Sequence, residues 1–201
     1  RPAAALALIL CAGAGAAVLA LRTPPGTIRV GSKNFTEQLI LGEILARTIE
    51  TRTSLAVERR FNLGGTFICD RAIRTGDIDL YVEYSGTAQT AIFREPPPAS
   101  RPEGFARLRA RYAAGGLTLL DPLGFENTFA MLVRGADARA HGWRTLSDLA
   151  RHPGALRAGF GYEFLQRADG FPGLARVYGL RLASPPAGMD LSLTYRALAE
   201  R

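Results

Sequence analysis

From residue 27 to the end of the chain, short apolar runs alternate with stretches of helical periodicity, and this alternation constrains the fold more than any other feature. The runs that predict strands are 27–30, 55–61, 78–82, 117–120, 128–133 and 156–160. The helical stretches are 35–50, 66–75, a helix that opens at Gly86, 102–114, 145–150, 162–167, a helix between Pro172 and Gly179, and 191–200. Strands that alternate with helices favour an α/β fold with a largely parallel sheet.

Capping residues mark several of these helix ends. Asn34 and Glu37 have the spacing of a capping box at the N-terminus of the first helix. In such a box, the side chain of each residue accepts a hydrogen bond from the backbone N–H of the other. Gly76 is suited to close the second helix, and Thr145 to cap the helix over 145–150. These signals are local, so they predict helix ends without reference to tertiary contacts.

The chain divides near residues 121–124, Asp-Pro-Leu-Gly, where proline and glycine separate one expected strand from the next. We expect a first lobe over 27–122 and a second lobe over 123–201. The second lobe ends on a helix that no further strand follows. We therefore expect it to be incomplete within this chain.

Residues 2–21 carry no charged side chain, and Arg1 and Arg22 flank them. As a helix they would rise about 30 Å, which matches the hydrocarbon core of a bilayer. A signal peptide, whose apolar region is usually about 7–15 residues, is the alternative, and a buried core helix comes third. Residues 23–26, Thr-Pro-Pro-Gly, break any helix. We expect 1–26 to form a transmembrane anchor or signal segment plus a linker, in a chain whose start at Arg1 indicates a longer or processed protein.

The composition excludes several function classes. With 201 residues, 47% of them hydrophobic, the chain can bury a core, so disorder is excluded as its main state. The net charge of +7 comes from basic residues that, apart from Lys33, are all arginines scattered singly, so we expect no nucleic-acid partner. Cys11 and Cys69 lie in different contexts, and no Cys/His cluster has the spacing of metal ligands, so we expect no metal site.

Enzyme motifs are not supported either. Gly159-Phe-Gly161 follows an apolar run as in a dinucleotide fingerprint, but Phe164 stands where the third glycine belongs. The sequence has no P-loop lysine after Gly64-Gly65-Thr66, and no GxSxG or HExxH motif. His141 and His152 fall in expected surface loops. We expect a protein that is not an enzyme and binds no cofactor.

Five motifs carry a resemblance to a known family. They are Gly-Ser-Lys-Asn-Phe-Thr-Glu-Gln at 31–38, Asn-Leu-Gly-Gly-Thr at 62–66, Asp-Leu-Tyr-Val-Glu-Tyr-Ser-Gly-Thr-Ala at 79–88, Phe-Glu-Asn-Thr-Phe-Ala at 125–130 and Glu-Phe-Leu-Gln-Arg-Ala-Asp-Gly at 163–170. From residue 27 onward the chain resembles the substrate-binding proteins of osmoprotectant ABC transporters, which bind glycine betaine, carnitine and choline. The resemblance implies a two-lobed periplasmic-binding-protein-like fold of type II, with the second lobe and the C-terminal return to the first lobe truncated here.

The resemblance also implies a ligand site made of Lys33, Tyr84, Thr87, Phe129 and Arg167. Aromatic faces suit a trimethylammonium group, which offers no hydrogen bonds. Lys33 lies just before a helix N-terminus, where the helix dipole also favours an anion. In the family pattern Tyr84 and Phe129 are cage walls, Thr87 is a carboxylate donor, and Arg167 grips the carboxylate and couples it to closure of the lobes.

Each assignment has a simpler alternative. Lys33 would then be a solvated residue at a helix start, and Arg167 a solvated helix arginine. Tyr84 would lie at the edge of the core, Thr87 would be a helix N-cap, and Phe129 an ordinary residue of a strand core.

The expected function is therefore the capture of a small zwitterionic or cationic quaternary ammonium ligand in an interlobe cleft, with a carboxylate-bearing ligand favoured over choline. By resemblance, the partners are an ABC permease, either fused to this chain or separate from it, and its separate ATPase, with the membrane reached through residues 2–21. The expected location is the periplasmic or extracellular face of the bacterial inner or cell membrane. The alternative is a ligand-sensing regulatory domain of the same two-lobed fold.

Overall fold

The computed structural model describes residues 26–154 and 156–200. The expected anchor over 2–21 and nearly all of the linker lie outside these residues. Within the described part of the chain, no helix combines the length and the apolar character needed to cross a membrane.

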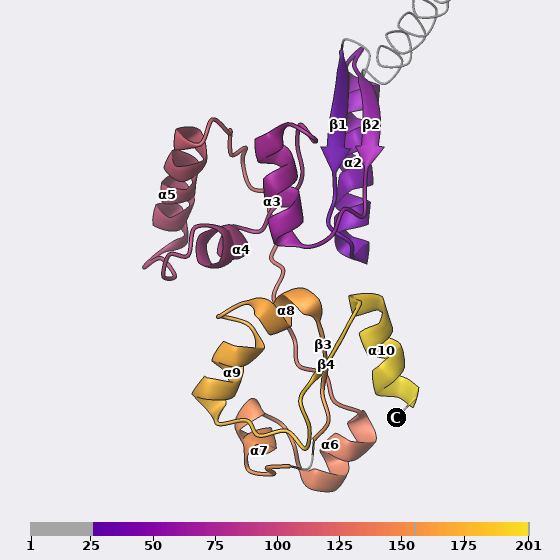
Figure 1. Ribbon diagram of the computed structural model, residues 1–201, viewed down its shortest axis with the longest axis vertical. Helices are drawn as coiled ribbons and strands as arrows, with labels where there is room; N and C mark the ends of the chain where they lie inside the picture. The colour runs from indigo at the N-terminus through magenta and orange to yellow at the C-terminus, as the bar shows by residue number, and fades with distance from the viewer. Residues whose placement is uncertain (1–25, 155, 201) are drawn as a thin grey trace, which may run out of the picture.

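The first group of elements occupies the upper half of Figure 1. It consists of β1 (Thr27–Gly31), α2 (Thr36–Arg52), β2 (Ala56–Arg60), α3 (Thr66–Thr75), α4 (Ser85–Thr87), the π-helical turn η1 (Ala88–Ile92) and α5 (Arg101–Ala114). β1 and β2 pair in parallel, with Thr27 opposite Ala56 and Gly31 opposite Arg60. α2 makes the crossover that parallel pairing requires.

The second group lies below the first in Figure 1, and an extended segment after α5 connects the two. It consists of α6 (Gly135–His141), α7 (Leu146–Ala150), β3 (Gly159–Gly161), α8 (Tyr162–Gln166), α9 (Phe171–Tyr178), β4 (Ala187–Met189) and α10 (Leu191–Glu200). β3 and β4 also pair in parallel. Of this group, α8 lies nearest to the first group, and this places the end of α8 at the junction.

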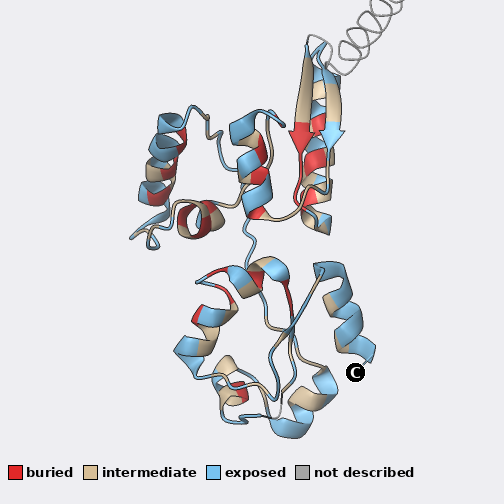
Figure 2. Ribbon diagram, in the orientation of Figure 1, coloured by how far each residue is buried: buried red, intermediate tan, exposed pale blue. Residues whose placement is uncertain are grey.

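The core of the first group forms where α4, η1 and α5 pack together. Ala88, Leu108 and Tyr112 are buried there, and Phe93 packs on them. In Figure 2 the buried residues gather on the faces of these helices that turn toward one another. Burial of this apolar surface is the main favourable contribution to the stability of such a helix cluster. It fixes α4 and η1, which carry part of the site.

Several local predictions are confirmed. α3 ends at Gly76, which adopts the left-handed conformation with φ of 74°. α7 begins after Thr145 with a complete capping box, in which Asp148 is the reciprocal partner. α9 ends at Gly179 with φ of 66°. Each signal depends on neighbours within four residues, and this explains why the sequence was sufficient.

Other predictions are wrong. α2 begins at Thr36, and its N-cap is Phe35, which makes no side-chain cap bond in the described structure, so Asn34 and Glu37 form no capping box. The segments 78–82, 117–120 and 128–133 are not strands in the described chain; one isolated bridge joins Val30 to Leu80. A strand needs a neighbour that supplies backbone partners, and apolar periodicity does not reveal one.

Two elements were not predicted. α6 and β4 have weak sequence signals because each is short and largely exposed. α6 ends at His141, so this histidine does not lie in a loop. Its ring stacks on Trp143 with ring centroids 4.6 Å apart.

Candidate ligand-binding site

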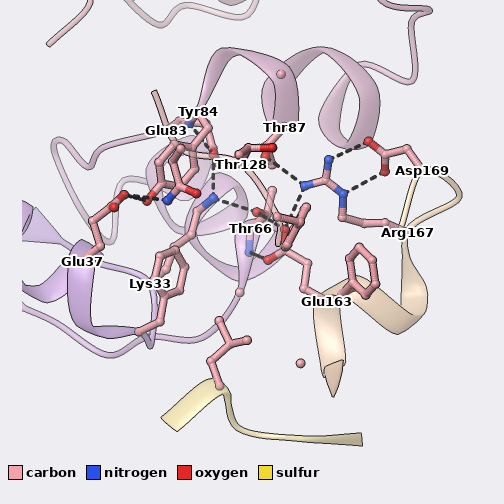
Figure 3. A pocket seen from close by; sticks show the side chains of 18 of the residues that line it. Lys33, Glu37, Thr66, Glu83, Tyr84, Thr87, Thr128, Glu163, Arg167 and Asp169 are labelled. Atoms are coloured by element: carbon pink, nitrogen blue, oxygen red, sulfur yellow. Dashed lines mark hydrogen bonds and ion pairs between the residues drawn. The ribbon is translucent and has the colours of Figure 1, made fainter. Parts of the chain in front are cut away.

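The structure brings the five predicted residues close to one another in a cleft that residues of both groups line: Lys33 lies over the ring of Tyr84, and Arg167 bonds to Thr87 and lies over the ring of Phe129. Lys33 lies two residues after the end of β1, and Tyr84 and Thr87 lie at the two ends of α4. Phe129 belongs to the extended segment before α6, and Arg167 is the C-cap of α8. Figure 3 shows four of them, Lys33, Tyr84, Thr87 and Arg167, within one hydrogen-bonded network.

Lys33 is buried, with 1% of the residue exposed, so the solvated-lysine alternative is wrong. Its Nζ donates to Glu83 Oε1 at 2.6 Å and to Thr66 Oγ1 at 2.7 Å. The same nitrogen lies 5.1 Å from the centroid of the Tyr84 ring. Burial raises the pKa of Glu83, and the ammonium of Lys33 opposes that rise. The lysine is thus one half of a buried ion pair.

Tyr84 is held by a carboxylate that the sequence reasoning assigned elsewhere. Its hydroxyl donates to Glu37 Oε1 at 2.6 Å, and Asn127 Nδ2 donates to the same oxygen at 2.7 Å. The ring of Phe35 stacks on that of Tyr84 with centroids 6.3 Å apart. Burial, followed by the hydrogen bond to Glu37, raises the pKa of Tyr84, so the phenol stays protonated and donates. This use of Glu37 explains why it forms no capping box.

Arg167 is also buried, with 6% of the residue exposed, so it is not a solvated helix arginine. A guanidinium has five N–H groups, and here each has an acceptor. Nε and Nη2 donate to the two oxygens of Asp169 at 2.9 and 2.7 Å. Nη1 donates to Thr87 Oγ1 at 2.9 Å and to Glu163 Oε1 at 3.2 Å, and Nη2 donates to Thr90 Oγ1 at 3.1 Å. The bonds to Asp169 raise the pKa of Arg167.

Thr87 and Phe129 likewise depart, Thr87 only in part, from their simpler alternatives. Thr87 is the N-cap of η1, as the simpler alternative has it, but its side chain makes no cap bond there, and its hydroxyl instead accepts the bond from Arg167. Phe129 is outside any described strand and is 57% exposed. Its ring contacts that of Phe164 at 4.7 Å between centroids and lies 5.8 Å from the guanidinium carbon of Arg167. The aromatic ring therefore presents an open face to the cleft.

Several polar residues of this network were not assigned to the site from the sequence. They are Glu37, Thr66, Glu83, Thr90, Asn127, Glu163 and Asp169. The oxygens of Glu163 accept from the amide and the hydroxyl of Thr66, at 3.0 and 2.7 Å. Burial acts to raise the pKa of Glu163, but these bonds and the charge of Lys33 outweigh it, and the pKa lies below its ordinary value. One signal was available, because Glu163 and Asp169 belong to the same motif as Arg167.

The side chains labelled in Figure 3 carry an excess of negative charge. The carboxylates are Glu37, Glu83, Glu163 and Asp169, and the cations are Lys33 and Arg167, which leaves a formal difference of two negative charges. Both cations are already paired with carboxylates, at 2.6 and 2.7 Å. Such a cleft attracts a cation more strongly than an anion. Among the described residues, no group of three His, Cys, Asp or Glu side chains is placed to hold a metal ion.

Two curated relatives match most of the sequence of this chain. An ergothioneine transport permease/ergothioneine binding protein of Helicobacter pylori is 34% identical over 170 residues, which cover 84% of this chain and 30% of the relative. A glycine-betaine-binding protein of Pseudomonas aeruginosa is 32% identical over 203 residues, which cover 96% of this chain and 64% of the relative. The chain thus spans less than two thirds of the length of these relatives.

A solved structure also resembles this chain. A crystal structure described as a glycine betaine/carnitine/choline ABC transporter matches with a TM-score of 0.61 and 27% identity, over 86% of this chain and 65% of the other. This neighbour agrees with a periplasmic-binding-protein-like α/β fold. Residues 26–201 match the family described as the substrate-binding domain of ABC-type glycine betaine transport systems. The chain therefore belongs to this family of substrate-binding domains.

Proposed function

We propose that this protein binds a small quaternary ammonium solute in the cleft between its two groups of elements and delivers it to the permease of an ABC transporter. The observation that carries the proposal is that the rings of Tyr84 and Phe129 and an excess of carboxylates line the same cleft. A trimethylammonium group needs π faces and negative potential rather than hydrogen-bond acceptors, and this lining supplies both. The ligand residues of the proposal are Lys33, Tyr84, Thr87, Phe129 and Arg167.

We infer that the cationic head of the ligand packs against Phe129 and Tyr84. The half-exposed ring of Phe129 offers an open face, and each cation–π contact contributes about 0.5–2 kcal/mol. The short bond from Tyr84 to Glu37 fixes the phenol ring and brings a negative charge behind it. Glu37 supports the cationic head through this ring.

A carboxylate on the ligand has to compete with protein acceptors for the N–H groups of Arg167. All N–H groups of Arg167 have protein acceptors, so a ligand carboxylate must replace one of them. The bond to Glu163, at 3.2 Å, is the longest and the easiest to exchange. We expect Arg167→Ala to weaken binding of glycine betaine at least tenfold and binding of choline far less, because a hydrogen bond to a charged group contributes about 1.5–3 kcal/mol. An equal loss for both ligands contradicts a carboxylate role for Arg167.

The transport context belongs to the same proposal. The permease partner is supported by the Helicobacter pylori relative, whose description names both a permease and a binding protein. A permease fused to this chain, a separate ATPase, attachment to the membrane through residues 2–21 and a position on the periplasmic or extracellular face complete the proposed arrangement. The lobes of this arrangement are 27–122 and 123–201.

Calorimetric titration of the full chain in detergent tests the proposal. The ligands are glycine betaine, carnitine, choline and ergothioneine, each at low and at moderate salt. We expect micromolar binding of at least one, with little dependence on salt because the contacts are buried. Phe129→Ala is expected to weaken that binding, whereas Phe129→Tyr keeps the π face and is the matched control. If none of the four ligands produces heat, the ligand class is wrong.

A further inference from the structure

Three threonines of the first group of elements face three charged residues of the second group. We call this set the threonine clasp; its members are Thr66, Thr87 and Thr90, and Glu163, Arg167 and Asp169. Five hydrogen bonds cross from one group to the other within it. All five join protein atoms to protein atoms, so the clasp needs no ligand atom in order to form. Figure 3 shows the bonds of Arg167 and Glu163.

Thr90 and Asp169 are members of the clasp that are not themselves proposed ligand residues, and both bond to Arg167. The hydroxyl of Thr90 donates to Asp169 Oδ2 at 2.7 Å and accepts from Arg167 Nη2 at 3.1 Å. Asp169 in turn holds the guanidinium through both of its oxygens. Thr90 therefore binds an ion pair of the second group, and bonds to charged groups are the stronger class of hydrogen bond.

The hydroxyl of Thr90 has a second acceptor within its own group, in the preceding helix α4. The carbonyl oxygen of Gly86 lies 2.8 Å from Thr90 Oγ1. When the two groups separate, the hydroxyl proton of Thr90 can turn to this carbonyl. Opening therefore leaves the Thr90 hydroxyl with an acceptor. The bond to Asp169 and the bond to Gly86 are alternatives, because a threonine hydroxyl has a single proton.

We propose that Thr90 and Asp169 are positioning residues that set the equilibrium between an open and a closed cleft, whichever ligand is bound. The inference rests on the proposed function, because it assumes that the cleft closes over a ligand. A group that stabilises only the closed arrangement raises the closed fraction, and the observed affinity for every ligand then changes by the same factor. A ligand contact, in contrast, changes affinity only for ligands that carry the contacted group.

Three variants isolate the hydroxyl. Thr90→Val keeps the shape of the side chain and removes both bonds across the clasp. Thr90→Ser restores the hydroxyl and is the rescue variant. Thr48→Val is the matched control, because the hydroxyl of Thr48 makes the same kind of bond to a carbonyl four residues earlier, Ile44, but within the exposed surface of α2.

The opening is measured by the distance between spin labels in the full chain in detergent. The labels are placed at the exposed positions Ala110 in α5 and Arg176 in α9, each changed to Cys, in a Cys11→Ser background. Cys69 is buried and stays unlabelled. The affinities for choline and for glycine betaine are measured on the same variants by calorimetry.

We expect Thr90→Val to add a population at longer distance and to weaken the binding of both ligands by the same factor, about tenfold. Thr90→Ser and Thr48→Val are expected to match the wild type in both measurements. Unchanged distances in Thr90→Val overturn the proposal, and so does a loss for glycine betaine more than threefold larger than for choline. If the wild type binds none of the four ligands named above, the proposed function fails, while the distance measurement still decides whether the hydroxyl closes the cleft.

Discussion

Lys33→Met is the substitution whose effect on stability is best defined by the structure. Lys33 and Glu83 form an ion pair with 2% and 6% of their side chains exposed, at 2.6 Å between Nζ and Oε1. Glu83 also accepts from the backbone amide of Tyr84 at 2.7 Å and from the hydroxyl of Tyr81 at 3.2 Å. The variant has a side chain of similar length without the charge, so the carboxylate loses its counter-ion but keeps its neutral donors.

The expected magnitude follows from the balance of attraction and desolvation. At 2.6 Å and an effective dielectric constant of about 20, the attraction between two unit charges is about 6 kcal/mol. The desolvation of two ions offsets most of this, so the intact pair adds little net stability. When one partner is removed, only the desolvated ion remains, and the cost is about 3–5 kcal/mol. For a chain of this size that cost corresponds to a fall in melting temperature of roughly 10 °C.

The loss of stability in Lys33→Met should increase with pH. Burial already raises the pKa of Glu83, and removal of Lys33 raises it further. Above the ordinary glutamate pKa, Glu83 of the unfolded chain releases its proton, whereas Glu83 of the folded variant still holds it. The destabilisation relative to wild type is therefore small near pH 5, where Glu83 can be protonated, and grows as the pH rises to 8.

Denaturant unfolding followed by circular dichroism measures this loss at both pH values. Glu83→Gln is the second single variant, and we expect the double variant to be more stable than the sum of the two single losses predicts, because it contains no buried ion. The reasoning is refuted if Lys33→Met lies within about 0.5 kcal/mol of wild type at pH 8, or if the two losses simply add.

Three further outcomes are expected. Glu37→Gln keeps the acceptor for Tyr84 and removes the charge. It should weaken choline binding about threefold to tenfold and leave binding of the neutral isostere 3,3-dimethylbutan-1-ol unchanged. Equal effects on the two ligands in calorimetry would contradict an electrostatic role of Glu37. Asp169 has its pKa lowered to about 2, chiefly by the hydrogen bond from its guanidinium partner, so its stabilising effect is present above its ordinary pKa near 4 and is lost as the pH falls toward 2. The difference in melting temperature between wild type and Asp169→Asn should therefore shrink over that range, and a constant difference would argue against the ion pair. Gly170→Ala should cost about 1–3 kcal/mol in denaturant unfolding, because the added methyl would overlap a carbonyl oxygen of α8, whereas Gly86→Ala meets nothing within 4 Å and should change stability by less than about 1 kcal/mol. Similar losses for both glycine variants would refute this steric argument.

The sequence by itself determined the helix ends at Gly76 and Gly179 and the capping box at Thr145. These features depend on a glycine that tolerates positive φ, or on a hydroxyl and a carboxylate three residues apart, so a short window contains all the necessary information. The five residues that the sequence pointed to are also among those that line the cleft.

Only the tertiary structure decided what those residues contact. Glu37 has the sequence position of a capping residue, yet its carboxylate binds Tyr84 and Asn127, which are 47 and 90 residues away. Lys33 was expected to be free for a ligand, and its nearest carboxylate is Glu83, 50 residues away. Such pairs depend on distances in space that no local pattern encodes.

The strands that were wrongly predicted have the same explanation. The segment 128–133 has the apolar pattern of a strand, but a ladder also needs a neighbouring backbone, which depends on how the rest of the chain folds. The sequence therefore determined several helix ends and part of the set of chemical groups at the cleft. The tertiary structure decided how the charges there are paired, because pairing depends on burial and distance, and both are properties of the folded chain.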